Sequence, residues 1–118
     1  MSAPDKPARI LVIEDDAMIR LMVSEVLGEA GHEVIEAGSA EAGLELFERE
    51  PADLVLLDLR LPGMSGFDAC TRLRAHPAGK HLPVMVMTGL DDRQSIIDAY
   101  DSGATDFLAK PIVWDLLP

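Results

Sequence analysis

Five short apolar runs alternate with longer amphipathic segments, and this alternation constrains the fold more than any other feature of the chain. The runs lie at 10–13, 34–35, 54–57, 84–87 and 105–109. The segments between them carry apolar residues three or four positions apart, as a helix that packs on one face does. Strands that alternate with helices form a parallel sheet with helices on both faces. The sequence therefore predicts a single α/β domain of five βα units.

Cap and stop residues support the expected helices. Ser39 can cap a second helix that ends before Pro51, and Asp91 or Asp92 can cap the fourth. Glycines are placed to stop the first and fourth helices. The residues expected to face the core on these two helices are Ile19, Met22, Val23, Val26, Leu27, Ala30, Ile96, Ile97 and Tyr100.

The ends of the chain are less regular. Residues 1–8 are polar and proline-rich, which indicates a flexible segment before a domain at 9–118. Only eight residues follow Lys110, so the fifth helix is expected to be truncated, at barely two turns. From this we expect the domain to have been cut from a longer multidomain protein.

Composition excludes several classes of protein. The 118 residues include 10 Lys and Arg against 21 Asp and Glu, for a net charge of -11, so direct nucleic-acid binding is not expected. A single cysteine, Cys70, excludes an internal disulfide and a cysteine-based metal cluster. The apolar runs are too short to cross a bilayer and no apolar leader is visible, which predicts a cytoplasmic protein without a membrane segment.

Polar residues follow four of the five expected strands. Glu14, Asp15 and Asp16 follow the first, and Asp58, Thr88 and Lys110 follow the third, fourth and fifth. Because the carboxyl ends of parallel strands meet at one edge, these side chains are expected to share a rim. Taken singly, each has a plainer interpretation, such as a helix N-cap for an aspartate or a surface position for the lysine.

The charges at this rim suggest its chemistry. Three carboxylates, from Glu14, Asp15 and Asp58, cannot all stay ionised at close range without compensation. One lysine and one divalent cation would balance them, and Mg²⁺ suits an all-oxygen site. Such a site can neutralise a phosphoryl group while a carboxylate attacks it. The sequence contains no G-x-x-x-x-G-K-[ST] or G-x-G-x-x-G motif, so a nucleotide is not the obvious phosphate source.

The set Glu14-Asp15, Asp58, Thr88 and Lys110-Pro111, in this order and spacing, resembles the receiver domain of bacterial two-component response regulators, the CheY-like family. The resemblance covers 9–117, and its supporting stretches are 10–16, 58–66 and 103–111. It implies a flavodoxin-like sheet in the strand order 2-1-3-4-5. It also implies a signalling domain that catalyses only its own phosphorylation and dephosphorylation.

The resemblance implies a role for each site residue. Asp58 would be the phosphoacceptor for a sensor histidine kinase or a histidine phosphotransfer protein. Asp15, Asp58 and the backbone carbonyl of Arg60 would ligate Mg²⁺, with Glu14 acting mainly through a metal-bound water. Thr88 and Lys110 would contact phosphoryl oxygens, and the Lys110-Pro111 peptide would be cis.

The resemblance also implies a switch. Thr88 would move toward the phosphoryl group and Phe107 would then turn inward. Many relatives have tyrosine at position 107, so switching here is expected to depend on packing and not on a hydroxyl. Arg60 and Leu90 flank the entry to the site and are expected either to tune the lifetime of the phosphoryl group or to be ordinary loop residues.

Other functions and outputs stay open at this stage. A pseudo-receiver without the chemistry, an aspartate-nucleophile phosphatase and a flavodoxin-like FMN carrier are the competing hypotheses. The tail with Trp114 resembles receivers joined to cyclic-di-GMP cyclase or phosphodiesterase domains. A histidine kinase fusion, a DNA-binding regulator and a stand-alone receiver are the alternatives. Homodimerisation through the fourth helix, fifth strand and fifth helix is common in the family that the sequence resembles.

Overall fold

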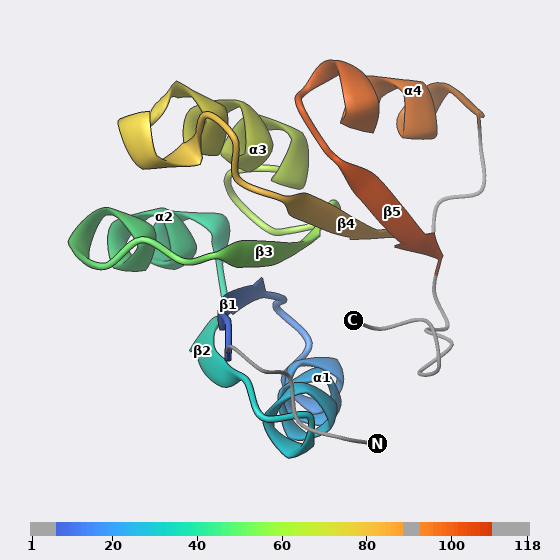
Figure 1. Ribbon diagram of the computed structural model, residues 1–118. Helices are drawn as coiled ribbons and strands as arrows, with labels where there is room; N and C mark the ends of the chain where they lie inside the picture. Colours follow the sequence, from blue (N-terminus) through green and yellow to red (C-terminus); the bar gives the residue numbers. More distant parts are fainter. Residues whose placement is uncertain (1–6, 89–92, 110–118) are drawn as a thin grey trace.

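A computed structural model of the protein describes residues 7–88 and 93–109. Its strands are β1 (Arg9–Ile13), β2 (Glu33–Ala37), β3 (Leu54–Asp58), β4 (Val84–Thr88) and β5 (Asp106–Ala109). All neighbouring strands are parallel, and they form one sheet in the order β2-β1-β3-β4-β5 (Figure 1). The predicted sheet and its strand order are therefore confirmed.

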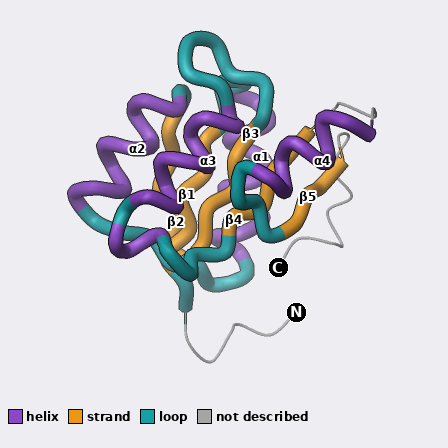
Figure 2. The backbone as a smooth tube through the Cα atoms, turned by 90° about the horizontal axis from the view of Figure 1, so that it is seen from above, coloured by secondary structure: helices purple, strands orange, loops and turns teal. Residues whose placement is uncertain are grey.

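The helices lie on both faces of this sheet. They are α1 (Ala17–Glu29), α2 (Ala40–Arg49), α3 (Gly66–Ala75) and α4 (Arg93–Asp101), with a short 3₁₀ helix, η1 (Pro77–Gly79). Helix α1 lies on one side, whereas α2, α3 and α4 lie on the other (Figure 1). Helices α2 and α3 run beside each other, with α2 packed on β1 and β2 and α3 on β3 (Figure 2). The 3₁₀ helix was not predicted.

Alternate residues of each central strand enter different halves of the core. In β1, Ile10 and Val12 pack with Val23 and Leu27 of α1. Leu11 and Ile13 belong instead to the cluster that contains Phe47, Cys70 and Leu73 of α2 and α3. Because both faces are covered, the central strands are apolar at nearly every position.

Capping residues set where the helices begin and end. The Asp16 carboxylate accepts hydrogen bonds from the amides of Met18 (2.9 Å) and Ile19 (3.2 Å) at the start of α1. Ser39 Oγ accepts a hydrogen bond from the amide of Ala42 (3.1 Å) at the start of α2, as predicted. Gly31 and Gly103, just after α1 and α4, have φ angles of 96° and 109°. These left-handed conformations favour glycine at both helix ends.

Three residues expected in the core are exposed instead. Met22 on α1 is 41% exposed, and Ile97 and Tyr100 on α4 are each 43% exposed. The apolar residues of α1 extend around more of the helix than the fold buries, and the buried ones are Val23 and Leu27. Helix α4 covers the β5 edge of the sheet, and Ala99 is its buried residue. The prediction that these three side chains face the core was wrong.

Several expectations fall on residues outside the described part of the chain. They concern residues 1–6 of the N-terminal segment, the Asp91 or Asp92 cap, Leu90, the Lys110-Pro111 peptide and the truncated fifth helix. Among the described residues, no helix is both long and apolar enough to cross a membrane.

Candidate metal centre

Two adjacent strands bring three carboxylates together at their carboxyl ends. Ile13 of β1 pairs with Leu57 of β3, so Glu14 and Asp58 follow at neighbouring positions of the sheet. Carboxylate oxygens of Glu14, Asp15 and Asp58 all lie within 4.8 Å of one another. Glu14 is fully buried, Asp58 is 3% exposed and Asp15 is exposed. The cluster therefore lies half inside the protein and opens to solvent at Asp15.

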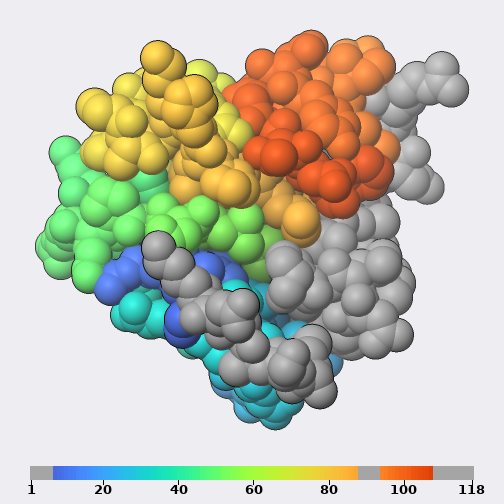
Figure 3. Space-filling view, in the orientation of Figure 1, coloured from blue at the N-terminus to red at the C-terminus, as the bar shows by residue number. Residues whose placement is uncertain are grey.

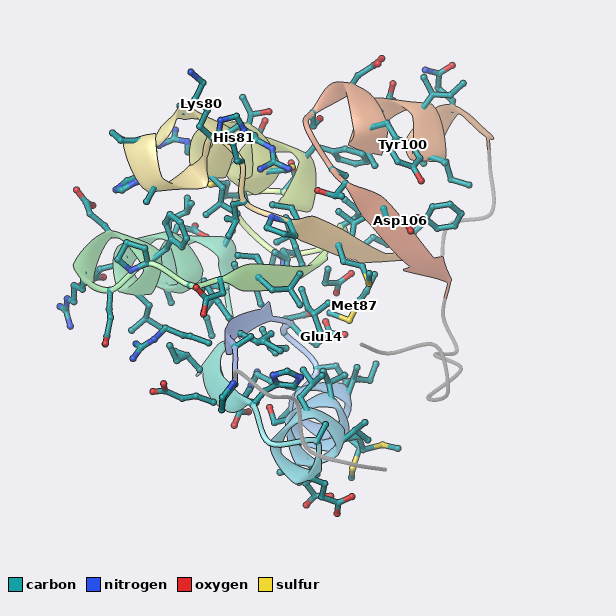
Figure 4. All side chains as sticks on the ribbon, viewed as in Figure 1. Glu14, Lys80, His81, Met87, Tyr100 and Asp106 are labelled. Atoms are coloured by element: carbon teal, nitrogen blue, oxygen red, sulfur yellow. The ribbon has the colours of Figure 1, made fainter. Side chains whose placement is uncertain are left out.

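Hydrogen bonds hold the β1 side of this cluster. The amide of Glu14 donates to the carbonyl of Ala37 at the end of β2 (3.0 Å). Nη1 of Arg20, one turn into α1, donates to the carbonyl of Glu14 (2.7 Å). Figure 4 shows the Glu14 side chain close to Met87 of β4, at the centre of the molecule. The backbone of Glu14 is thus held through both its amide and its carbonyl.

The β3 side is held by the loop that leads into α3. The amide of Arg60 donates to Oδ1 of Asp58 (3.1 Å), and the amide of Gly66 donates to the carbonyl of Leu59 (3.2 Å). A Cβ at position 66 would lie 2.3 Å from the carbonyl oxygen of Asp58. Glycine at the start of α3 therefore allows the helix to begin directly against the end of β3.

The donor set fits Mg²⁺. Its ligand atoms are all carboxylate oxygens, which hard divalent cations prefer, and the open side at Asp15 leaves room for retained waters. Two of the three carboxylates are buried close together, an arrangement that a cation stabilises. The described contact of Arg60 is through its amide, so the expected ligand role of its carbonyl stays a prediction.

The expected switch residues lie on β4 and β5. The backbone of Thr88 ends β4 beside Ala109, at the same end of the sheet as Asp58. Phe107 is half-buried, and its ring packs edge-on against Tyr100 of α4, with ring centres 6.3 Å apart. Lys110, the expected partner of the phosphoryl group, lies outside the described residues.

Tyr100 ties α4 to β5 next to Phe107. Its hydroxyl donates to Oδ1 of Asp106 (3.2 Å), and Figure 4 shows the two side chains pointing toward each other. Partial burial raises the pKa of Tyr100 above its usual value, and the bond to Asp106 adds to this effect. Figure 3 shows the atoms of α4 and β5 as one continuous surface. Tyr100, which the helical periodicity predicts to face the core, makes this contact at the surface instead.

The three histidines are not part of the carboxylate cluster. Nδ1 of His32 accepts a hydrogen bond from the amide of Ala8 (3.1 Å). Nδ1 of His76 accepts one from the amide of Ala78 (3.0 Å) and so caps η1. His81 is exposed, and Figure 4 places it far from Glu14. His32 and His76 thus accept hydrogen bonds from backbone amides, and His81 lies at the surface.

A family model describes the chain. The model of the response regulator receiver domain matches residues 10–117, which is most of the sequence. The chain belongs to this family. Receiver domains are signalling modules of two-component systems, which implies histidine kinases as partners.

Individual relatives of the receiver domain agree with this assignment. Response regulator PleD of Caulobacter vibrioides is 42% identical over 106 residues, which cover 89% of this chain and 23% of PleD. The chain thus spans about a quarter of the length of that relative. A putative response regulator from Chloroflexus aurantiacus has a crystal structure that superposes with a TM-score of 0.89 at 36% identity, covering 93% of this chain and 90% of that one.

A further solved structure bears on the metal. The receiver domain of sensor histidine kinase PA1611 from Pseudomonas aeruginosa has a TM-score of 0.85 and 25% identity, covering 93% of this chain and 90% of that one. That structure has a magnesium ion coordinated in its active-site cleft. Receiver domains bind Mg²⁺ generally, and the acidic cluster of this chain can hold such an ion.

Proposed function

We propose that Asp58 accepts a phosphoryl group from the phosphohistidine of a sensor histidine kinase or phosphotransfer protein. The observation that carries this proposal is the placement of Asp58, 3% exposed at the end of β3, with carboxylate oxygens of Glu14 and Asp15 within 4.8 Å. An oxygen of Asp58 forms the new P–O bond while the P–N bond to histidine breaks. The leaving imidazole nitrogen keeps the electron pair of that bond.

The acidic cluster makes this reaction dependent on a cation. We assign Asp15, Asp58 and the carbonyl of Arg60 as direct ligands of Mg²⁺, with Glu14 acting through a water. When bound, the ion neutralises the charge of the phosphoryl group and the carboxylates. Without a cation, a negatively charged donor would have to approach three carboxylates, which their combined field opposes. Glu14 and Asp15 therefore act in metal binding, and Asp58 acts both there and as the nucleophile.

The same proposal assigns the switch. Thr88 and Lys110 contact phosphoryl oxygens, and Thr88 moves toward them, which opens space for Phe107. The support for packing as the driving term is that Phe107 has no hydroxyl and contacts the ring of Tyr100. Arg60 and Leu90, at the entry to the site, tune the lifetime of the phosphorylated state.

The output is a covalently linked domain or a partner protein. The chain spans only part of the length of PleD, which supports a covalently linked output domain. Among output types, we favour a cyclic-di-GMP cyclase or phosphodiesterase on the sequence of the tail with Trp114. A net charge of -11 argues against direct contact of this domain with nucleic acid.

Intact-mass spectrometry after incubation with acetyl phosphate tests the reaction. The wild-type chain is expected to gain one phosphoryl group in Mg²⁺ and none in EDTA. Asp58→Asn should gain none, because an amide is not a nucleophile here. Asp68→Asn is the matched control, since Asp68 is an exposed aspartate in the first turn of α3, and it should behave as wild type.

Two results would contradict the proposal. One is a phosphoryl group on Asp58→Asn at the wild-type level, which would place the acceptor elsewhere. The other is a folded wild-type chain that gains none from acetyl phosphate or from phosphorylated histidine kinases. That result would identify a pseudo-receiver, which keeps the fold without the chemistry.

A further inference from the structure

Arg20 of α1 contacts the candidate metal centre through the backbone of Glu14. Its Nη1 donates to the carbonyl of Glu14 at 2.7 Å, and its Nε lies 3.3 Å from Oε1 of Glu36 on β2. The side chain of Arg20 is 23% exposed and that of Glu36 is 43% exposed. One guanidinium thus joins α1, the loop after β1 and the neighbouring strand β2.

The carbonyl that Arg20 binds belongs to the peptide between two expected metal ligands. A peptide unit is planar, so the orientation of the Glu14 carbonyl sets the plane that contains the Cα atoms of both Glu14 and Asp15. The amide of Glu14 is held by Ala37 at 3.0 Å. Arg20 is therefore placed to fix the direction from which both carboxylates leave the backbone.

The geometry of this contact requires an arginine. The guanidinium uses two different nitrogens of one rigid plane for its two partners. A lysine has one nitrogen on a flexible stem and cannot reproduce both contacts with the same orientation. The charge of Arg20 is largely offset by Glu36, so its contribution to the field at the cluster is smaller than that of an unpaired cation.

Gly38 leaves the space that the guanidinium occupies. A Cβ at position 38 would lie 3.3 Å from Nη1 of Arg20, closer than an ordinary van der Waals contact. An alanine at this position would therefore push against the nitrogen that binds the Glu14 carbonyl. The substitution changes no charge. Residue 38 also lacks the positive φ angle that would strain an alanine there.

We propose that Arg20 is a positioning residue for the Mg²⁺ site, acting through the peptide between Glu14 and Asp15. The inference rests on the proposed function, because it assigns Glu14 and Asp15 to metal binding. Groups that orient metal ligands from outside the coordination shell change metal affinity by about 10- to 100-fold when they are replaced. Since Arg20 orients two ligands through their backbone, we expect an effect near the lower end of this range.

Calorimetric titration of the whole chain with MgCl₂ alone tests this role. Arg20→Lys should weaken Mg²⁺ binding about tenfold while keeping the positive charge. Arg49→Lys is the matched control, because Arg49 also pairs with a glutamate at 2.7 Å but lies on the exposed side of α2. Gly38→Ala should weaken binding in the same direction. Gly28→Ala, which has no atom within 4 Å of its new methyl group, should not.

Urea unfolding in EDTA is measured on every variant, so that loss of fold is separated from loss of affinity. Equal Mg²⁺ affinity in wild type, Arg20→Lys and Gly38→Ala would overturn the positioning role and leave the proposed function standing. Tighter binding in Arg20→Lys would also overturn it. A folded wild-type chain that binds no Mg²⁺ would overturn both. If Arg20→Lys does not fold, the comparison of Gly38→Ala with Gly28→Ala decides.

Discussion

Replacing Asp58 with asparagine should stabilise the metal-free protein. Two other carboxylates have oxygens within 4.8 Å of it, and one of them, Glu14, is fully buried. At 4.8 Å, two unit charges repel by about 1 kcal/mol in water and about 3.5 kcal/mol at an effective dielectric constant of 20. Removing Asp58 relieves two such pairs. Its bond from the amide of Arg60 can persist, because asparagine keeps Oδ1.

The expected gain is about 1–3 kcal/mol, since the exposed side of the cluster at Asp15 screens part of the repulsion. Urea unfolding followed by circular dichroism in EDTA measures it. With an m-value of about 1.5 kcal/mol/M, the midpoint of Asp58→Asn should rise by roughly 0.7–2 M. Excess Mg²⁺ should then raise the midpoint of the wild type far more than that of the variant, because only the wild type keeps all its ligands.

The exposed control, Asp68→Asn, should stay within about 0.5 kcal/mol of the wild type in both conditions. If Asp58→Asn is as stable as the wild type or less stable in EDTA, repulsion does not dominate the cluster. If Mg²⁺ stabilises the wild type and the variant equally, the ion binds elsewhere. Either result would refute the reasoning from geometry to metal dependence.

Three further predictions concern the scaffold. Arg74→Met should destabilise the fold by about 3 kcal/mol, because Arg74 donates to three backbone carbonyls and to the hydroxyl of Thr105. Thermal unfolding measures this loss, and the control Arg72→Met, at an exposed position, should show no comparable loss. Gly66→Ala should cost about 2 kcal/mol or more, because its Cβ would meet the Asp58 carbonyl at 2.3 Å, and it should slow phosphorylation of Asp58 by acetyl phosphate. Cys70 should resist a thiol reagent at pH 8 until urea unfolds the chain, because it is 1% exposed and burial raises its pKa. Reaction of the native protein at the rate of free cysteine would contradict this.

The sheet and the acidic cluster could be predicted because both depend on local patterns and on one rule of topology. The strands centre on short apolar runs, and four of the five runs are followed by a polar residue. Parallel pairing then places those ends at one edge whatever the details of packing. Glu14 and Asp58 are 44 positions apart in sequence, yet they follow paired residues of β1 and β3. The topology alone is enough to bring them together.

Exposure of apolar residues was less predictable. Periodicity shows that one side of a helix is apolar, but it does not show how wide a stripe the rest of the fold covers. Met22 lies at the margin of the buried stripe of α1, and Ile97 lies on α4 at the β5 edge of the sheet, and both are exposed. Tyr100 is amphipathic, and its hydroxyl finds Asp106 at the surface.

The contacts of Arg20 and Arg74 have no local pattern at all. Their principal partners are backbone carbonyls, which every residue carries, so the identity of the partner residue holds no information about the contact. What distinguishes these two arginines is space, since glycines 38 and 103 leave room where a Cβ would press on each side chain. The residues that form the cluster can thus be read from polar positions at strand ends. The groups that orient it depend on glycines and carbonyls brought near by the fold, and only the three-dimensional arrangement identifies them.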